Sequence, residues 1–185
     1  MKKTLYITSG APNAGKTSFV KSRIDALGGI YISRDEIRSS LLTPGEYIFK
    51  NESKVFNTFI KNIQEAIDKK FGDTDIYIDA THLNSRSRHK VLGKLNLNNV
   101  DKIIVLWFDI PLEILLGRNF IGGKERVPQS AVENMYKTMD VPDTREFPFK
   151  RSEIWRIDKE GWCEEAKVKI DSLTITRKDI YERAI

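Results

Sequence analysis

The sequence contains little of the sulfur and imidazole chemistry that many enzymes use. Among its 185 residues there is one cysteine, Cys163, and there are two histidines, His82 and His89. A disulfide framework needs paired cysteines, and a Cys- or His-rich zinc site needs several such ligands, so both are excluded. Any catalysis must therefore rest on carboxylates, lysines, arginines and hydroxyls.

Long apolar runs are also missing. No stretch approaches the ~20 residues that cross a bilayer, and the first ten residues hold too few apolar side chains for a signal peptide. We therefore expect a soluble protein that has no membrane partner and resides in the reducing cytoplasm.

Positive charge is in moderate excess and is unevenly distributed. The chain has 31 Lys and Arg against 26 Asp and Glu, a net charge of +5. Residues 151–185 are balanced, so the excess belongs to the first 150 residues. The segment 80–100 carries Arg86, Arg88, Lys90 and Lys94 and no acidic residue. This segment is either a surface for a polyanion or a solvated helix face.

Short apolar runs alternate with longer stretches of helical period, without repeats or flexible linkers. We expect one domain over residues 1–185, with a motif-bearing core at 1–149 and a C-terminal strand and helical extension at 150–185. The alternation predicts βαβ crossovers, and hence a three-layer α/β/α fold around a parallel sheet of about five strands. Ligands bind at the carboxyl ends of such strands. The predicted strands are centred on residues 5–7, 30–32, 76–78, 103–108 and 154–157.

A glycine-rich segment follows the first predicted strand and precedes a helical pattern. The pattern Gly-x-x-x-x-Gly-Lys-Thr there predicts a P-loop, in which backbone N–H groups and a helix N-terminus bind phosphates. Lys16 would reach the outer phosphates, and Thr17 would ligate Mg²⁺. The chain lacks the Asn-Lys-x-Asp guanine motif of switch GTPases, which favours a phosphotransferase. The residues expected to bind ATP, or another nucleoside triphosphate, are Gly10, Ala11, Pro12, Asn13, Ala14, Gly15, Lys16, Thr17 and Ser18.

Charged residues also follow the second strand. Asp35 is placed to accept the proton of an acceptor hydroxyl. Arg38, one turn further along, could hold a phosphate of the acceptor or the transferring group, and Arg34 is a further candidate for the acceptor. Ser33 and Glu36 form a capping-box pattern that would begin a helix here. The alternative is that Asp35 only stabilises the helix dipole and that the arginines are surface charges.

The third and fourth strands each end at an aspartate. Asp79 suits the carboxylate that binds Mg²⁺ or fixes the P-loop hydroxyl, whereas Asp109 precedes Ile110-Pro111 and could cap a helix. We favour Asp79. Thr81 could contact an acceptor phosphate or cap a helix.

A double glycine at 122–123 is flanked by Arg118, Lys124 and Arg126. We expect a mobile lid there, in which these cations approach the transferring phosphates and exclude water. Ordinary surface charge at a helix end is the alternative.

Together these motifs resemble the phage-type polynucleotide 5′-kinases among the small P-loop phosphotransferases. The resemblance covers roughly residues 1–140. It rests on the P-loop, the segments 34–38 and 79–84, and the lid segment from Arg118 to Pro128 with Met135 and Met139 behind it. Two positions depart from the phage pattern, whose acidic residue would fall on Ala80 and whose second lid arginine would fall on Gly122. Lys124 or Arg126 would then substitute for that arginine.

The resemblance implies transfer of the γ-phosphate of ATP to the 5′-OH of DNA or RNA, with Mg²⁺. It implies that Lys16, Asp35, Arg38 and Arg126 are catalytic and that Arg118 binds ATP. The expected acceptor contacts are Arg34, Arg38, Thr81, Arg86 and Arg88, and the expected metal ligands are Thr17 and Asp79. A phage-encoded protein would act in the host cytoplasm. Alternatives are a kinase of a small hydroxyl metabolite and a non-catalytic nucleotide-binding module, and assembly into a homo-oligomer stays open.

Overall fold

The fold is built around a mostly parallel sheet. The computed structural model describes residues 2–43, 47, 49–69, 72–121, 124–125, 127–147, 150–161, 163–169 and 172–175. The strands of the sheet are β1 (Lys3–Ser9), β2 (Ile30–Ser33), β3 (Thr74–Asp79), β4 (Lys102–Phe108), β7 (Arg151–Ile157), β8 (Cys163–Lys169) and β9 (Ser172–Ile175). Within the described residues their order is β2-β3-β1-β4-β7-β8-β9. The first five in this order pair in parallel, which confirms the predicted sheet.

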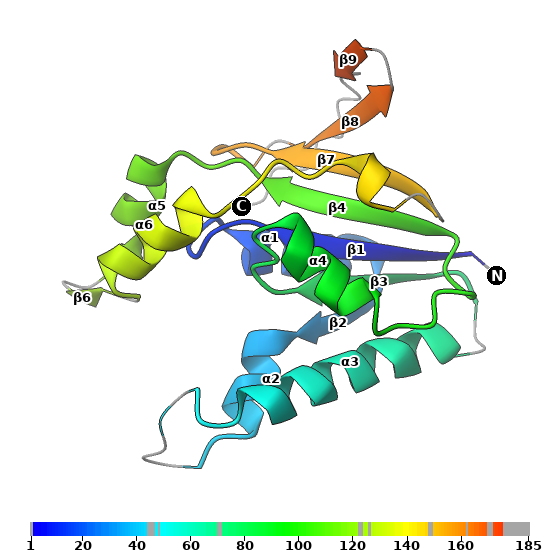
Figure 1. Ribbon diagram of the computed structural model, residues 1–185, viewed down its shortest axis with the longest axis horizontal. Coiled ribbons are helices and arrows are strands. Elements are labelled where there is room, and N and C mark those ends of the chain that lie inside the picture. The colour runs from blue at the N-terminus through cyan, green and yellow to red at the C-terminus, as the bar shows by residue number, and fades with distance from the viewer. Residues whose placement is uncertain are drawn as a thin grey trace.

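Helices cover both faces of the sheet. They are α1 (Lys16–Leu27), α2 (Arg34–Ser40), α3 (Glu52–Asp68), α4 (Ser85–Leu92), α5 (Leu112–Asn119) and α6 (Gln129–Lys137), with a 3₁₀ turn, η1 (Thr144–Glu146). One core cluster joins the sheet to α3 and α4, and another joins it to α1, α5 and α6. The three-layer architecture is therefore confirmed (Figure 1). None of the helices in the described part of the chain is long and apolar enough to traverse a bilayer.

The strands contribute apolar side chains to both faces of the sheet. Ile7 and Ile78 face α3 and α4, while Tyr6 and Tyr77, one residue away on the same strands, belong to the opposite cluster. Alternate residues of a strand point to opposite faces, so a strand buried on both sides is a continuous apolar run.

The C-terminal segment differs from its prediction. A helical extension was expected after β7, but 163–169 and 172–175 form strands that continue the sheet in antiparallel pairing. The pairing supplies partners for backbone groups of β7, which would otherwise be a sheet edge. The alternation of Ala166 and Val168 with lysines is a strand signal that the sequence analysis missed. Residues 176–185 lie outside the described residues.

The strand order fixes where a ligand can bind. The chain leaves β1 toward β2 on one side, and β3 leads to β4 on the other side, so the connections diverge between β1 and β3. Such a switch point opens a crevice at the carboxyl ends of the strands. In Figure 1 the α2 end of the molecule and the α5–α6 segment both lie at this end of the sheet.

Arg88 lies in the interior, although it was expected on a basic surface that contacts the acceptor. Its side chain is fully buried on the inner face of α4, where it pairs with Asp140 at 2.5 Å and with Glu146 at 2.6 Å. It also donates to Ser9 Oγ and to the His82 carbonyl, both at 3.2 Å. Because both ends of the guanidinium are engaged within the protein, the prediction that Arg88 binds an acceptor is wrong.

Arg88→Ala should therefore destabilise the fold. Removing one partner of a buried ion pair leaves the remaining charges uncompensated, at a cost of about 3–5 kcal/mol. Urea unfolding measures this loss in the free energy of unfolding. The matched control is Arg86→Ala on the exposed face of the same helix, which should change it by less than about 0.5 kcal/mol. Equal effects of the two substitutions would contradict an interior role for Arg88.

His82 is a second buried polar residue at the end of β3. Its ring stacks on Phe59 at a centroid distance of 6.3 Å, and its Nδ1 lies 2.9 Å from the Thr8 carbonyl. Its φ of 38° is in the left-handed region, which is uncommon for residues other than glycine, although histidine adopts it more often than most. Burial lowers the pKa of His82 from 6.5 to about 4, and the nearby Arg34 and Arg88 act in the same direction. The residue is therefore neutral at physiological pH.

His82 should make the fold less stable in acid. Between pH 6.5 and 4 the unfolded imidazole binds a proton that the native one does not, so stability falls as pH falls through this range. His82→Asn tolerates the positive φ and removes the titration. Between pH 7 and pH 5, urea unfolding should show the wild type losing about 2 kcal/mol more than the variant. Parallel pH profiles would show that His82 does not titrate in this way.

Candidate active site

The P-loop connects β1 to α1 with the backbone that its sequence predicts. Gly15 precedes α1 with φ 90°, and Asn13 has φ 64°. Gly10 lies so close to β4 that a Cβ there would be 2.9 Å from that of Phe108. The loop can therefore curl over the strand ends only with glycine at positions 10 and 15, and it ends at a helix N-terminus that favours anions.

Lys16 lies at the centre of the site. Its Nζ donates to the Ala11 carbonyl at 2.7 Å, which folds the side chain back over the P-loop. Burial lowers the pKa of Lys16 to about 8, although the carboxylates of Asp79 and Asp35 oppose this shift. A phosphate group would supply the negative charge that a desolvated ammonium favours.

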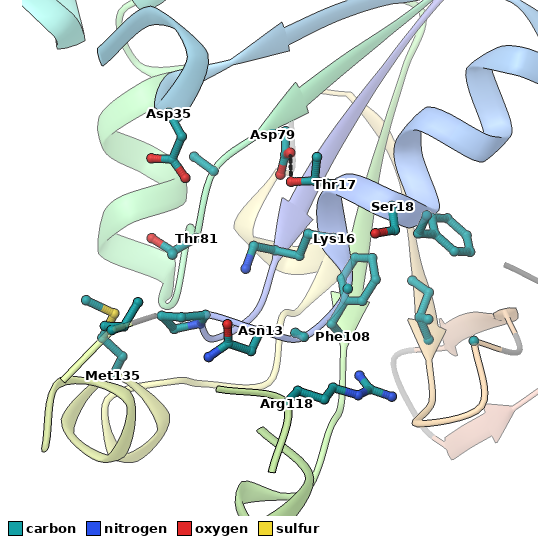
Figure 2. A pocket seen from close by; sticks show the side chains of 18 of the residues that line it. Asn13, Lys16, Thr17, Ser18, Asp35, Asp79, Thr81, Phe108, Arg118 and Met135 are labelled. Atoms are coloured by element: carbon teal, nitrogen blue, oxygen red, sulfur yellow. Dashed lines mark hydrogen bonds between the residues drawn. The ribbon is translucent and has the colours of Figure 1, made fainter. Parts of the chain in front are cut away.

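Asp79 joins the P-loop helix to two strands. It accepts a 2.6 Å bond from the Thr17 hydroxyl (Figure 2). It also accepts a 2.7 Å bond from the Tyr31 hydroxyl. Burial and the bond to Asp79 raise the pKa of Tyr31. Asp109, the alternative carboxylate, instead pairs with Arg156 at 2.5 Å and caps no helix with its side chain.

The oxygens of Thr17 and Asp79 are hard ligands of the kind that Mg²⁺ prefers. Since Mg²⁺ keeps several waters and uses few protein ligands beside substrate phosphates, this pair fits the ion. Within the described residues no cluster of three or more His, Cys, Asp or Glu side chains offers another metal site.

The second charged segment begins α2. The Ser33 side chain accepts from the Glu36 backbone N–H at 3.3 Å, as the capping pattern predicts, and the Glu36 carboxylate pairs with Lys21 of α1. Asp35 projects from the first turn with 85% of its side chain exposed, and it pairs with Arg38 one turn later. The Asp35 carboxylate is thus accessible from solvent, and its ion pair with Arg38 orients it.

Glu52, at the start of α3, holds both arginines of α2. It accepts from Arg38 Nε at 2.6 Å and from Arg34 at 2.8 Å. The bond from Arg38 lowers the pKa of Glu52, and the same bond raises the pKa of Arg38. The sequence analysis missed Glu52 because it lies 14 residues beyond Arg38, outside any local motif.

One cavity of about 1000 Å³ is lined by the P-loop, by Asp79 and by the charged residues at the start of α2. Figure 2 shows Lys16 in the middle, with Asp35 and Thr81 on one side and Arg118 on the other. Met135 of α6 lies beyond Thr81. The lining also includes residues 158–161 after β7, where the Lys159 carbonyl accepts from Arg118 at 2.7 Å. The volume is sufficient for a nucleotide and part of an acceptor.

Asn119 links the P-loop to the lid segment. Its side chain accepts from Asn13 at 3.0 Å and exchanges bonds with the backbone of Val127. Because Asn119 is buried, these bonds fix both ends of the segment between α5 and α6.

Apart from Gly10 and Ala11, which do not line the cavity, and the buried Arg88, the predicted site residues divide into three groups. The P-loop residues 12–18 line the cavity with Arg34, Asp35, Arg38, Asp79, Thr81 and Arg118. Arg86 is exposed on α4 and is not among the cavity-lining residues. Arg126 and the double glycine lie outside the described residues, and for Lys124 only the backbone is described, in β6 (Lys124–Glu125) paired with β5 (Phe120–Ile121). The mobility of the lid therefore stays a prediction.

Similarities to known proteins agree with this geometry. A curated relative, L-seryl-tRNA(Sec) kinase of Methanococcus maripaludis, is 27% identical over 148 residues, which are 76% of this chain and 54% of the relative. The chain thus spans about half the length of the curated relative that it matches.

Two solved structures share the fold. A chain of the Pnkp1/Rnl/Hen1 RNA repair complex superposes with a TM-score of 0.62 at 22% identity, covering 74% of this chain and 44% of that one. A gluconokinase from Sinorhizobium meliloti gives a TM-score of 0.52 at 14% identity, covering 82% of each chain. At such identities the likeness concerns the fold alone.

The family comparison covers most of the chain. Residues 5–142 match the family described as AAA domain, a range that begins in β1 and ends beyond α6. It includes the P-loop, the start of α2 and the end of β3, which together form the cavity described above. The chain belongs to this AAA domain family and has a kinase-type P-loop fold.

Proposed function

We propose that the chain is a polynucleotide 5′-hydroxyl kinase that transfers the γ-phosphate of ATP to the 5′-OH end of DNA or RNA. The observation that carries the proposal is that Lys16 and an accessible carboxylate, Asp35, line the same cavity. Phosphoryl transfer to a hydroxyl needs a cation on the phosphates and a carboxylate beside the attacking oxygen.

The donor would bind on the P-loop side. Backbone N–H groups of the loop and the Lys16 ammonium would hold the β- and γ-phosphates, and Arg118 would contact the nucleotide. Thr17 and Asp79 would hold Mg²⁺, which neutralises charge on these phosphates when it is bound. Arg126 is proposed as a further lid cation.

The acceptor would bind beside α2. Asp35 would take the proton of the acceptor hydroxyl while the oxygen of that hydroxyl bonds to the γ-phosphorus. The bond from that phosphorus to the oxygen bridging to the β-phosphate breaks, and ADP leaves with the electron pair. Arg34, Arg38 and Thr81 would bind an acceptor phosphate, and exposed Arg86 would extend the positive charge along α4.

Similarity to a kinase of L-seryl-tRNA favours a second candidate acceptor, a hydroxyl on an aminoacyl-tRNA. A small hydroxyl metabolite is the third, and the shared fold of the gluconokinase is compatible with it. The exposure of Asp35 favours the macromolecular acceptors, because a chain end can reach this carboxylate without enclosure.

Asp35→Asn should remove phosphoryl transfer while leaving ATP binding intact. The variant cannot accept the hydroxyl proton, so kcat should fall by about 10²- to 10⁴-fold. The assay follows label from γ-labelled ATP with Mg²⁺ onto 5′-OH oligonucleotides, seryl-tRNA or a panel of small alcohols. The matched control is Glu36→Gln, since this neighbouring carboxylate pairs with Lys21 and should leave kcat unchanged. Label that moves only onto seryl-tRNA or a small alcohol would rule out the polynucleotide kinase.

Glu52→Gln should weaken acceptor use without affecting the donor. Without the Glu52 charge, Arg34 and Arg38 lose the partner that orients them beside Asp35. Charge-assisted hydrogen bonds contribute roughly 1.5–3 kcal/mol, so kcat/KM for the acceptor should fall by about 10-fold or more. KM for ATP should stay constant. Glu65→Gln, on the exposed face of the same helix, serves as the control. An equal rise of KM for ATP in Glu52→Gln would show a general loss of structure.

A further inference from the structure

Two aromatic side chains are exposed between α2 and α3. Tyr47 and Phe49 are 70% and 51% exposed, and their rings meet edge to face at a centroid distance of 5.7 Å. An exposed pair of large aromatic rings leaves apolar area in water that contact with a ligand would remove. The pair therefore needs a functional explanation more than an isolated surface residue does.

Phe49 belongs to the cavity, which distinguishes it from other exposed apolar residues. The described part of the chain has five large hydrophobic side chains of this exposure: Leu27, Tyr47, Phe49, Phe120 and Val141. Of these five, only Phe49 lines the cavity, together with Arg34, Asp35 and Arg38. The exposed ring is thus on the acceptor side of the site.

Arg38 holds the Phe49 ring from one side. Its guanidinium carbon is 5.3 Å from the ring centroid, within the range of a cation–π contact. Glu52 and Asp35 fix the same guanidinium. The ring is therefore placed beside the carboxylate and still has half of its surface free for another group.

The chemistry around Phe49 indicates what that group is. A flat apolar surface in contact with Arg38, in a cavity that Arg34 also lines, suits a planar aromatic ring that is joined to a phosphate. A nucleobase next to a backbone phosphate has this form, and every base offers a π face, so stacking tolerates any sequence. A sugar or a small alcohol has no aromatic face joined to a phosphate.

We propose that Phe49, with Tyr47 at its edge, is the platform on which the 5′-terminal base of the acceptor stacks. This inference rests on the proposed polynucleotide kinase activity and adds a specificity-determining subsite to it. Stacking on Phe49 positions the terminal nucleoside so that its 5′-hydroxyl faces Asp35. The phosphate on its 3′ side then lies within reach of Arg34 and Arg38.

The test compares two oligonucleotides that differ only in the first residue, one with a normal 5′ nucleotide and one with a 5′-terminal abasic residue that keeps the 5′-OH. Because stacking on an aromatic side chain strengthens the binding of a base, the wild type should prefer the normal oligonucleotide by about 10-fold in kcat/KM, which corresponds to about 1.4 kcal/mol. Phe49→Ala should lose most of this preference, with KM for ATP unchanged. Phe49→Trp should keep it, whereas Phe49→Leu, which retains apolar bulk without a ring face, should not.

Phe120→Ala is the matched control, because Phe120 is an exposed phenylalanine that does not line the cavity. It should keep the preference for the normal oligonucleotide. If Phe49→Ala retains the wild-type preference, or Phe49→Leu does, the stacking platform is refuted even though the kinase activity stands. If the wild type phosphorylates no oligonucleotide, the proposed function itself fails. That outcome is read from the wild type alone, so the two failures are distinguishable.

Discussion

The carboxylate of Asp79 is the interaction on which the site depends. It is buried at the end of β3, where it accepts bonds from Thr17 of α1 and Tyr31 of β2, and Thr8 of β1 lies 3.3 Å away. A buried carboxylate without such partners would be strongly unfavourable, so the three elements must keep this arrangement. The P-loop helix is thereby fixed against the strand ends before any phosphate binds.

The buried guanidinium of Arg88 makes similar connections on the other side of the sheet. Arg88 pairs with Asp140, in the segment after α6, and donates a hydrogen bond to Ser9, the residue directly before the P-loop. Asn119 similarly connects Asn13 of the P-loop to Val127. The elements that frame the cavity are therefore joined by buried polar side chains, and a shift in one of them would disturb the others.

The two sides of the cavity differ in how firmly they are built. On the donor side Asp79 is buried, Lys16 is half-buried, and both are hydrogen-bonded within the fold. On the acceptor side Asp35 is exposed and is held mainly through Arg38 and Glu52. In the proposed reaction, a nucleoside triphosphate would offer the same phosphates in every turnover, whereas the end of a polynucleotide acceptor would vary. The rigid donor side and the open acceptor side match that difference.

Local sequence determined the parallel sheet, the P-loop and the position of Asp35, because short-range periodicity and the spacing of glycines encode them. Tertiary structure decided the rest. Arg88 lies in a run without acidic residues and has the local pattern of a surface charge, but Asp140 and Glu146, more than 50 residues away, draw it into the interior. Glu52 reaches Arg38 only because α3 packs on α2, and the strand at 163–169 forms because β7 offers an unpaired edge. Contacts between residues far apart in the chain cannot be predicted from local residue spacing. A charged residue that would bind a ligand at the surface has a structural role when it is buried and paired.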